Sequence, residues 1–177
     1  MSDPALTSFA PARSYGWAWL VGLIALVVLP VLPLFMLETP PEGEDAVALW
    51  VTVAIMLPLV GFLLATLVSL PLMRYELTRD ALVLSCGPLL RYRIPFAEIV
   101  DVRRTDLSPS LWSSMRMPGL ALWGVPYADA GKVYMCATRM AKGVMLVSTA
   151  TKRYGLTPSD EDAFVTALRM MLPRTDT

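Results

Sequence analysis

The chain begins with two long apolar stretches that contain no charged residue. The first covers residues 14–37, the second covers residues 46–73, and an acidic segment, residues 38–45, lies between them. As helices that rise about 1.5 Å per residue, both are long enough to cross a hydrocarbon layer of roughly 30 Å. The pattern therefore predicts a membrane protein with a hairpin of two transmembrane helices.

A secretory signal peptide is the alternative for the first stretch, and a buried helix of a soluble protein is the alternative for the second. The apolar part of a signal peptide is usually about 7–15 residues long and ends in a cleavage site of small residues. Residues 14–37 form a longer run and end without such a site. The length of the second stretch and its lack of charge favour a membrane span.

The charged residues beside the spans predict the orientation of the hairpin. The loop of residues 38–45 holds four acidic residues and no basic one, whereas Arg13 precedes the first span and Arg74 follows the second. Because Lys and Arg accumulate on the cytoplasmic side, we expect an extracytoplasmic loop and two cytoplasmic termini. Residues 1–13 are then a cytoplasmic tail, and residues 74–177 form a cytoplasmic domain.

Small residues recur at every fourth position on both spans, a spacing that lets helix backbones approach closely. They are Ala18 and Gly22 in the first span and Gly61, Ala65 and Ser69 in the second. Two interpretations remain open: the spans pack on each other, or one of these faces contacts another membrane protein. Neither span holds an ionisable residue of the kind that marks an ion or proton pathway.

The domain after the spans shows the alternation of apolar and polar positions that is typical of short strands. Strands are expected at residues 74–78, 81–84, 91–94, 100–103, 132–137, 144–148 and 152–156. A final amphipathic helix should begin with Thr157 as N-cap and Pro158 in its first turn, and Pro173 should end it. The predicted fold is a mainly-β barrel of six or seven antiparallel strands, closed at one end by a C-terminal α-helix.

Composition removes several classes of function. From residue 74 onward there are fourteen basic and ten acidic residues, too slight an excess for nucleic-acid binding. The chain has no histidine, and Cys86 and Cys136 are not spaced as metal ligands, so we expect reduced structural thiols. No nucleotide-binding or nucleophile motif occurs either. We therefore expect no enzyme activity, no metal site and no cofactor.

Three short motifs of the domain are similar to those of a known family. They are R-Y-E-L-T at residues 74–78, I-P-F-A-E-I at residues 94–99 and R-Y-G-L-T-P at residues 153–158. Over roughly residues 73–172 the chain resembles the bacterial pleckstrin-homology (PH-like) domain family. The resemblance implies a PH-like barrel that is often membrane-anchored and often self-associating, with no enzymatic activity and no agreed ligand.

Four arginines form the first candidate site. Arg91 and Arg93 project from one face of a predicted strand, and Arg103 and Arg104 follow on the next strand. Eukaryotic PH domains that bind phosphoinositides combine a basic pair of this spacing with a Lys in the first hairpin loop, but residues 85–88 contain no Lys. The four arginines are either a solvated row of charge that faces the membrane or a lipid-headgroup site.

Residues 106–130 form the second candidate site, because they are long for an irregular connection and rich in apolar side chains. The candidates within this segment are Trp112, Met115, Arg116 and Trp123. The segment either folds over the domain core, with a strand near residues 119–125, or contacts a partner. Trp and Met are favoured at protein interfaces, and Trp is also favoured at bilayer interfaces.

Together these features predict a non-catalytic interaction protein in the bacterial cytoplasmic (inner) membrane. We expect an accessory, scaffold or assembly subunit that binds another integral membrane protein or forms a homo-oligomer. The alternative is binding of anionic lipid headgroups, or membrane sensing, through the arginines. The expected partners are the lipid bilayer and a membrane protein, and not nucleic acid.

Overall fold

The computed structural model describes residues 6–33, 43–108 and 116–172. The chain divides into two compact units. A helical unit consists of Trp17–Val68, and a larger unit combines Met1–Gly16 with Ser69–Thr177. The chain therefore leaves the larger unit after Gly16 and re-enters it at Ser69.

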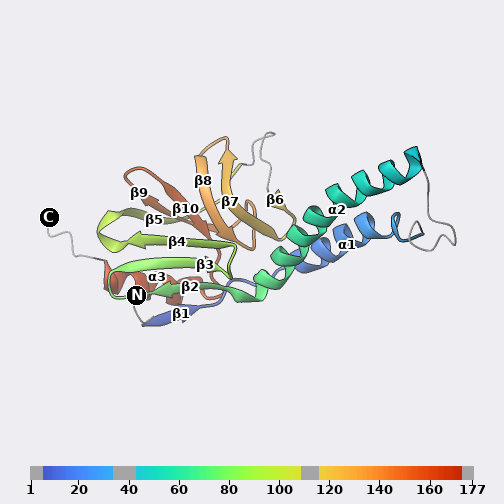
Figure 1. Cartoon of the computed structure of the whole chain (residues 1–177). Coiled ribbons are helices and arrows are strands. Elements are labelled where there is room, and N and C mark those ends of the chain that lie inside the picture. The colour runs from blue at the N-terminus through green and yellow to red at the C-terminus, as the bar shows by residue number, and fades with distance from the viewer. Residues whose placement is uncertain (1–5, 34–42, 109–115, 173–177) are drawn as a thin grey trace. The chain divides into compact units, whose positions relative to one another are not determined.

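The helical unit holds α1 (Gly16–Val28) and α2 (Glu44–Ser69) (Figure 1). α2 has 26 residues and continues through Pro58 without a break. The stretch Ala46–Leu72, which covers most of α2, has a mean hydropathy of 2.5. Among the described residues it is the one helical stretch that is long and apolar enough to cross a membrane. This finding agrees with the second predicted span.

α1 is shorter than the predicted span of residues 14–37. It has 13 residues and ends at Val28, so its length is roughly 20 Å, less than the thickness of the hydrocarbon layer. Pro30 explains this end, because proline disfavours the helical conformation in the residue before it and breaks the helical hydrogen-bond ladder. Residues 34–37 lie outside the described part of the chain, and the two-helix hairpin stays a prediction.

The larger unit contains two β-sheets and the C-terminal helix α3 (Glu161–Met171) (Figure 1). One sheet has the order β1-β2-β3-β4, with β1 (Thr7–Phe9), β2 (Met73–Leu77), β3 (Ala81–Cys86) and β4 (Leu90–Pro95). The other has the order β5-β9-β10-β8-β7-β6, with β5 (Ile99–Thr105), β6 (Arg116–Met117), β7 (Leu120–Tyr127), β8 (Gly131–Ala137), β9 (Val144–Thr149) and β10 (Arg153–Leu156). Short 3-10 helices, η2 (Leu70–Leu72) and η3 (Phe96–Glu98), precede β2 and β5. The predicted mainly-β domain with a C-terminal helix is confirmed at this level.

The sheets differ from the prediction in strand direction and in strand number. β8 and β10 are parallel neighbours, with Val133 opposite Arg153 and Tyr134 opposite Tyr154, so the expectation of antiparallel strands alone is wrong. β1 and β6 are additional to the predicted strands. β7 corresponds to the strand considered near residues 119–125. Alternation along a strand identifies its buried face but does not identify its neighbours.

The residues predicted as an N-terminal tail include a strand of the larger unit. β1 pairs with β2 in an antiparallel register. Further along, the amide of Ala12 donates a 2.7 Å hydrogen bond to the carbonyl of Thr157, and the ring of Phe9 packs edge-on against Phe164 at 5.3 Å. The N-terminal residues thus contact both β2 and the region where α3 begins.

Tyr75 of β2 joins the two sheets and α3. Its side chain is fully buried, and its hydroxyl donates a 2.8 Å hydrogen bond to the carbonyl of Cys136 in β8. The same hydroxyl accepts a 3.3 Å bond from the amide of Thr157, and the ring contacts Phe164 of α3. Burial raises the pKa of this phenol well above its usual range, so the hydroxyl stays protonated.

Helix α3 begins later than predicted. Its N-cap is Asp160, whose carboxylate accepts a 2.9 Å hydrogen bond from the amide of Ala163, and not Thr157. The hydroxyl of Thr157 accepts instead from the amide of Thr138 at 2.9 Å, inside the domain. The side chain that local sequence predicts as the cap therefore forms a hydrogen bond with a distant residue instead.

Candidate functional site

The four candidate arginines lie on the edge strands of two different sheets. Arg91 and Arg93 are on β4, and Arg103 and Arg104 are on β5. All four side chains are exposed. The structure thus places the predicted set as two pairs and not as one continuous row.

Carboxylates accompany three of these arginines. Arg93 forms a 2.7 Å ion pair with Asp80, and the guanidinium holds the pKa of that carboxyl below its usual value, mainly by donating a hydrogen bond. Arg104 pairs with Glu161 of α3 at 3.1 Å. Arg103 lies 3.6 Å from the carboxylate two residues before it on the same strand. Glu161 also pairs with Arg139 at 3.3 Å, so the carboxylates offset part of the positive charge and reduce the attraction of these arginines for an anionic surface.

The second candidate site is only partly within the described residues. Trp112 and Met115 lie outside them, whereas Arg116 belongs to β6 and Trp123 belongs to β7. Most apolar side chains that follow in β7 are buried: Leu120, Ala121, Leu122, Val125 and Tyr127. These side chains belong to the domain core, and contact of the segment with a partner stays a prediction.

Trp123 has an unusual backbone conformation. Among the described residues it is the one non-glycine residue with a positive φ, +63°. A bulky side chain pays about 1–2 kcal/mol for this left-handed conformation. Trp123 is half-buried in the middle of β7, between the buried Leu122 and Val125. The pairing of β7 with β8 continues in register on both sides of this residue.

The small-residue positions of the helices lie on exposed faces. Ala18, Gly22, Gly61 and Ala65 are exposed, and a Cβ placed on either glycine would meet nothing within 4 Å. Only Ser69, at the end of α2, is buried. The two glycines therefore do not mark a close contact between α1 and α2.

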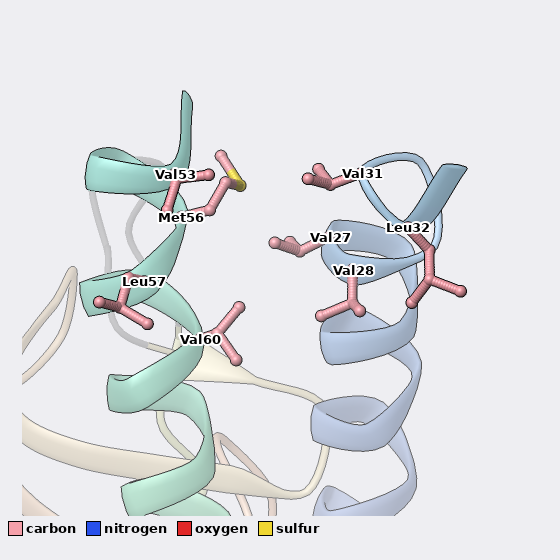
Figure 2. Close-up of a pocket in the computed structure, with 8 residues that line it drawn as sticks. All are labelled: Val27, Val28, Val31, Leu32, Val53, Met56, Leu57 and Val60. Carbon is pink, nitrogen blue, oxygen red and sulfur yellow. The ribbon is translucent and has the colours of Figure 1, made fainter. Parts of the chain in front are cut away.

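Larger apolar side chains face each other across the helical unit instead. They enclose a groove of about 180 Å³ between the two helices (Figure 2). The lining residues are Val27, Val28, Val31, Leu32, Val53, Met56, Leu57 and Val60. The two helices of this unit therefore meet through larger apolar side chains beside the groove, and Gly22 and Gly61 are exposed.

A cluster of lysines and tyrosines, which sequence reasoning missed, lies where the two sheets meet. We call Lys132, Tyr134, Lys152, Tyr154 and Tyr92 the lysine–tyrosine surface. The three rings pack together with centroid distances of 5.6–5.7 Å, and the two ammonium groups lie 5.4 and 5.6 Å from the ring centre of Tyr134. The repeated triplet K-x-Y at residues 132–134 and 152–154 was the available signal. It acquires meaning only when the two strands are known to be neighbours.

The hydroxyls of Tyr92 and Tyr154 remain protonated at neutral pH. Burial, with smaller contributions from Cys136 and the neighbouring tyrosines, raises the pKa of Tyr92 to about 12. Burial also raises the pKa of Tyr154, and the carboxylate of Glu98 adds to this effect. The surface thus offers two cations and neutral hydroxyls.

The two cysteines are free and buried, as expected of structural thiols. Burial raises the pKa of the Cys86 thiol to about 11 and raises that of Cys136 as well. Neither thiol is a reactive thiolate at neutral pH. Within the described ranges, no three Cys, Asp or Glu side chains come together as a metal-binding group.

Comparison with known proteins gives one match. No curated protein and no solved structure matches the chain. The family model of the bacterial PH domain matches residues 73–172, which run from β2 through the end of α3. The chain therefore belongs to the bacterial PH domain family.

Proposed function

We propose that this chain is a non-catalytic, membrane-anchored PH-domain protein of the bacterial inner membrane. Its helices hold the domain at the cytoplasmic face. There it acts as an accessory, scaffold or assembly subunit that binds another integral membrane protein or a second copy of itself.

The main support for the membrane anchor is that the chain leaves the larger unit and returns to it. The hydroxyl of Ser14 donates a 2.6 Å hydrogen bond to the carbonyl of Gly119, and β1 pairs with β2, so both flanks of Trp17–Val68 belong to one folded unit. A folded unit lies on one side of a bilayer. If α2 crosses the membrane, residues 17–43 must supply a second crossing. This requirement supports the hairpin and the location of both termini on one side of the membrane. It is independent of the argument from charged residues beside the spans.

The connection between anchor and domain is short. α2 ends at Ser69, and the three residues of η2 lead directly into β2. A connection of this length keeps the domain close to the membrane surface and restricts it to partners within that layer. The exposed small residues of α1 and α2, described above, support a partner that contributes a transmembrane helix.

The alternative, lipid-headgroup binding through Arg91, Arg93, Arg103 and Arg104, has less support. Three of these arginines have carboxylate neighbours, and the two pairs lie on different sheets. A charged headgroup would have to compete with these ion pairs.

Two measurements test the proposal. Carbonate extraction and topology reporters at both ends and in the loop of residues 38–45 should give a membrane-integral chain with both ends cytoplasmic. Crosslinking in cells, followed by mass measurement in mild detergent, should give a complex larger than a monomer. The proposal would be contradicted if carbonate extracted the chain from the membrane or if the reporters placed its ends on opposite sides. A monomer without any crosslinked partner would also contradict it.

A matched pair of helix variants tests the partner surface. Gly61→Leu places a large side chain on the small-residue face of α2, and Ala48→Leu makes a similar change on a different face of the same helix. Both positions are exposed. The crosslinked complex should weaken with Gly61→Leu and persist with Ala48→Leu. Equal behaviour of the two variants would exclude this face as the contact.

A further inference from the structure

The parallel pairing of β8 with β10 brings two copies of the same triplet side by side. Tyr134 lies opposite Tyr154, and Val133 lies opposite Arg153. Lys132 and Lys152 each precede the pair of Val133 and Arg153 by one residue, and their ammonium groups lie 5.4 and 5.6 Å from the ring centre of Tyr134. Figure 1 shows β8 and β10 as neighbours in the six-stranded sheet.

Two like charges at neighbouring positions of adjacent strands destabilise a sheet. In the part of the chain that the structure describes, neither Lys132 nor Lys152 has an ion pair with a carboxylate, in contrast to Arg93 and Arg104. Glu98 is close enough to influence Tyr154 but pairs with neither lysine. Among the described residues, no carboxylate therefore offsets the repulsion between the two ammonium groups.

The surroundings accommodate the lysines in this arrangement. A Cβ on Gly124, the β7 residue opposite Tyr134, would lie 2.5 Å from Cε of Lys132, so the glycine leaves the space in which the lysine side chain lies. Both ammonium groups lie over Tyr134, whose electron-rich ring attracts cations. Tyr92 of β4 packs on Tyr134 from the other sheet and fixes its ring.

We propose that Lys132 and Lys152, whose ammonium groups both lie near the ring of Tyr134, form a binding site for a phosphate group. A phosphate monoester carries about −1.5 to −2 charges at neutral pH and three acceptor oxygens, which match two ammonium donors. Its source is either an anionic lipid headgroup or a free phosphate compound. The inference does not rest on the membrane anchor or the protein partner proposed above.

Amine footprinting of the full chain tests this site. Acetylation of each lysine is followed by mass spectrometry in uncharged detergent, with inorganic phosphate or with chloride at equal ionic strength. Phosphate should slow the reaction of Lys132 and Lys152, while the exposed Lys142 serves as the internal control. Equal protection by chloride would mean simple screening and would overturn the proposal.

A second arm distinguishes the sources of phosphate. The full chain is reconstituted in vesicles of phosphatidylcholine alone or with added phosphatidic acid, whose headgroup is a phosphate monoester, in buffer free of phosphate. Protection by anionic vesicles without protection by inorganic phosphate assigns a lipid headgroup, and protection by inorganic phosphate in detergent assigns a free compound. Unchanged reactivity of both lysines in both arms would overturn the site.

Variants separate binding from folding. Lys152→Gln should weaken phosphate binding by about tenfold, the loss expected for one charge-assisted hydrogen bond, and Lys142→Gln should leave it unchanged. Without phosphate and at low salt, Lys152→Gln should have a Tm equal to or above that of the unchanged chain, because the repulsion is removed. A lower Tm, or unchanged phosphate affinity, would contradict the proposed arrangement.

Discussion

The hydroxyl of Tyr75 is the most sharply testable element of the domain core. The variant Tyr75→Phe keeps the ring but removes the group that donates to the carbonyl of Cys136 at 2.8 Å and accepts from the amide of Thr157 at 3.3 Å. Both backbone groups are buried and would lose this partner. Leaving a buried polar group unsatisfied costs about 1–3 kcal/mol. The 3.3 Å bond is the weaker of the two, so we expect a loss of roughly 2–4 kcal/mol in the free energy of unfolding.

Urea unfolding of the full chain in mild detergent, followed by near-UV circular dichroism, measures this loss. Tyr15→Phe is the matched control, because Tyr15 is 81% exposed and belongs to the same unit. That substitution should change the free energy of unfolding by less than about 0.5 kcal/mol. If Tyr75→Phe costs no more than Tyr15→Phe, the hydroxyl does not join the two sheets to α3, and the reasoning about this core is refuted.

Three further predictions concern other parts of the domain. Gly119→Ala should destabilise it more than Gly131→Ala in thermal unfolding, since both glycines have positive φ but only at Gly119 would the new Cβ meet a backbone nitrogen, 2.6 Å away. In Arg93→Gln, the free energy of unfolding should fall less steeply as the pH is lowered. The lowered pKa of Asp80 stabilises the folded state above the usual pKa of 3.8, and this stabilisation is lost as the pH falls through the lower pKa of the folded state. An unchanged acid profile would remove the role of that ion pair. A thiol reagent at pH 7.5 should modify Cys136 only on unfolding, because the thiol is fully buried and its pKa is raised; rapid labelling of the folded chain would contradict this.

Local sequence predicted the elements whose signal is periodic. The strands around Tyr75, Leu84 and Ile94, and the helix that buries Phe164 and Leu168, follow from alternation and from the 3.6-residue period. The long apolar run in the sequence is sufficient to predict α2. The extent of α1 was less predictable, because apolar composition continues past the proline that ends the helix.

The candidate site depended on contacts that sequence does not encode locally. Arg93 and Arg104 are isolated cations in the sequence, but strand pairing and the packing of α3 supply Asp80 and Glu161 as partners. Local sequence also predicts the side chain of Thr157 as a helix cap. In the structure, its hydroxyl accepts a hydrogen bond from the amide of Thr138 in the domain interior. In each case the competing partner is distant along the chain.

The sequence by itself determined where apolar and polar faces lie, and with them the long helix, the mainly-β domain and the final helix. Those features depend on the identity of residues a few positions apart. Only the tertiary structure decided that β8 and β10 are parallel neighbours, that Lys132 and Lys152 both lie near Tyr134, and that the N-terminal strand pairs with β2. Neighbours and register are fixed by the burial of whole faces against distant segments, so alternation within one strand carries no information about them.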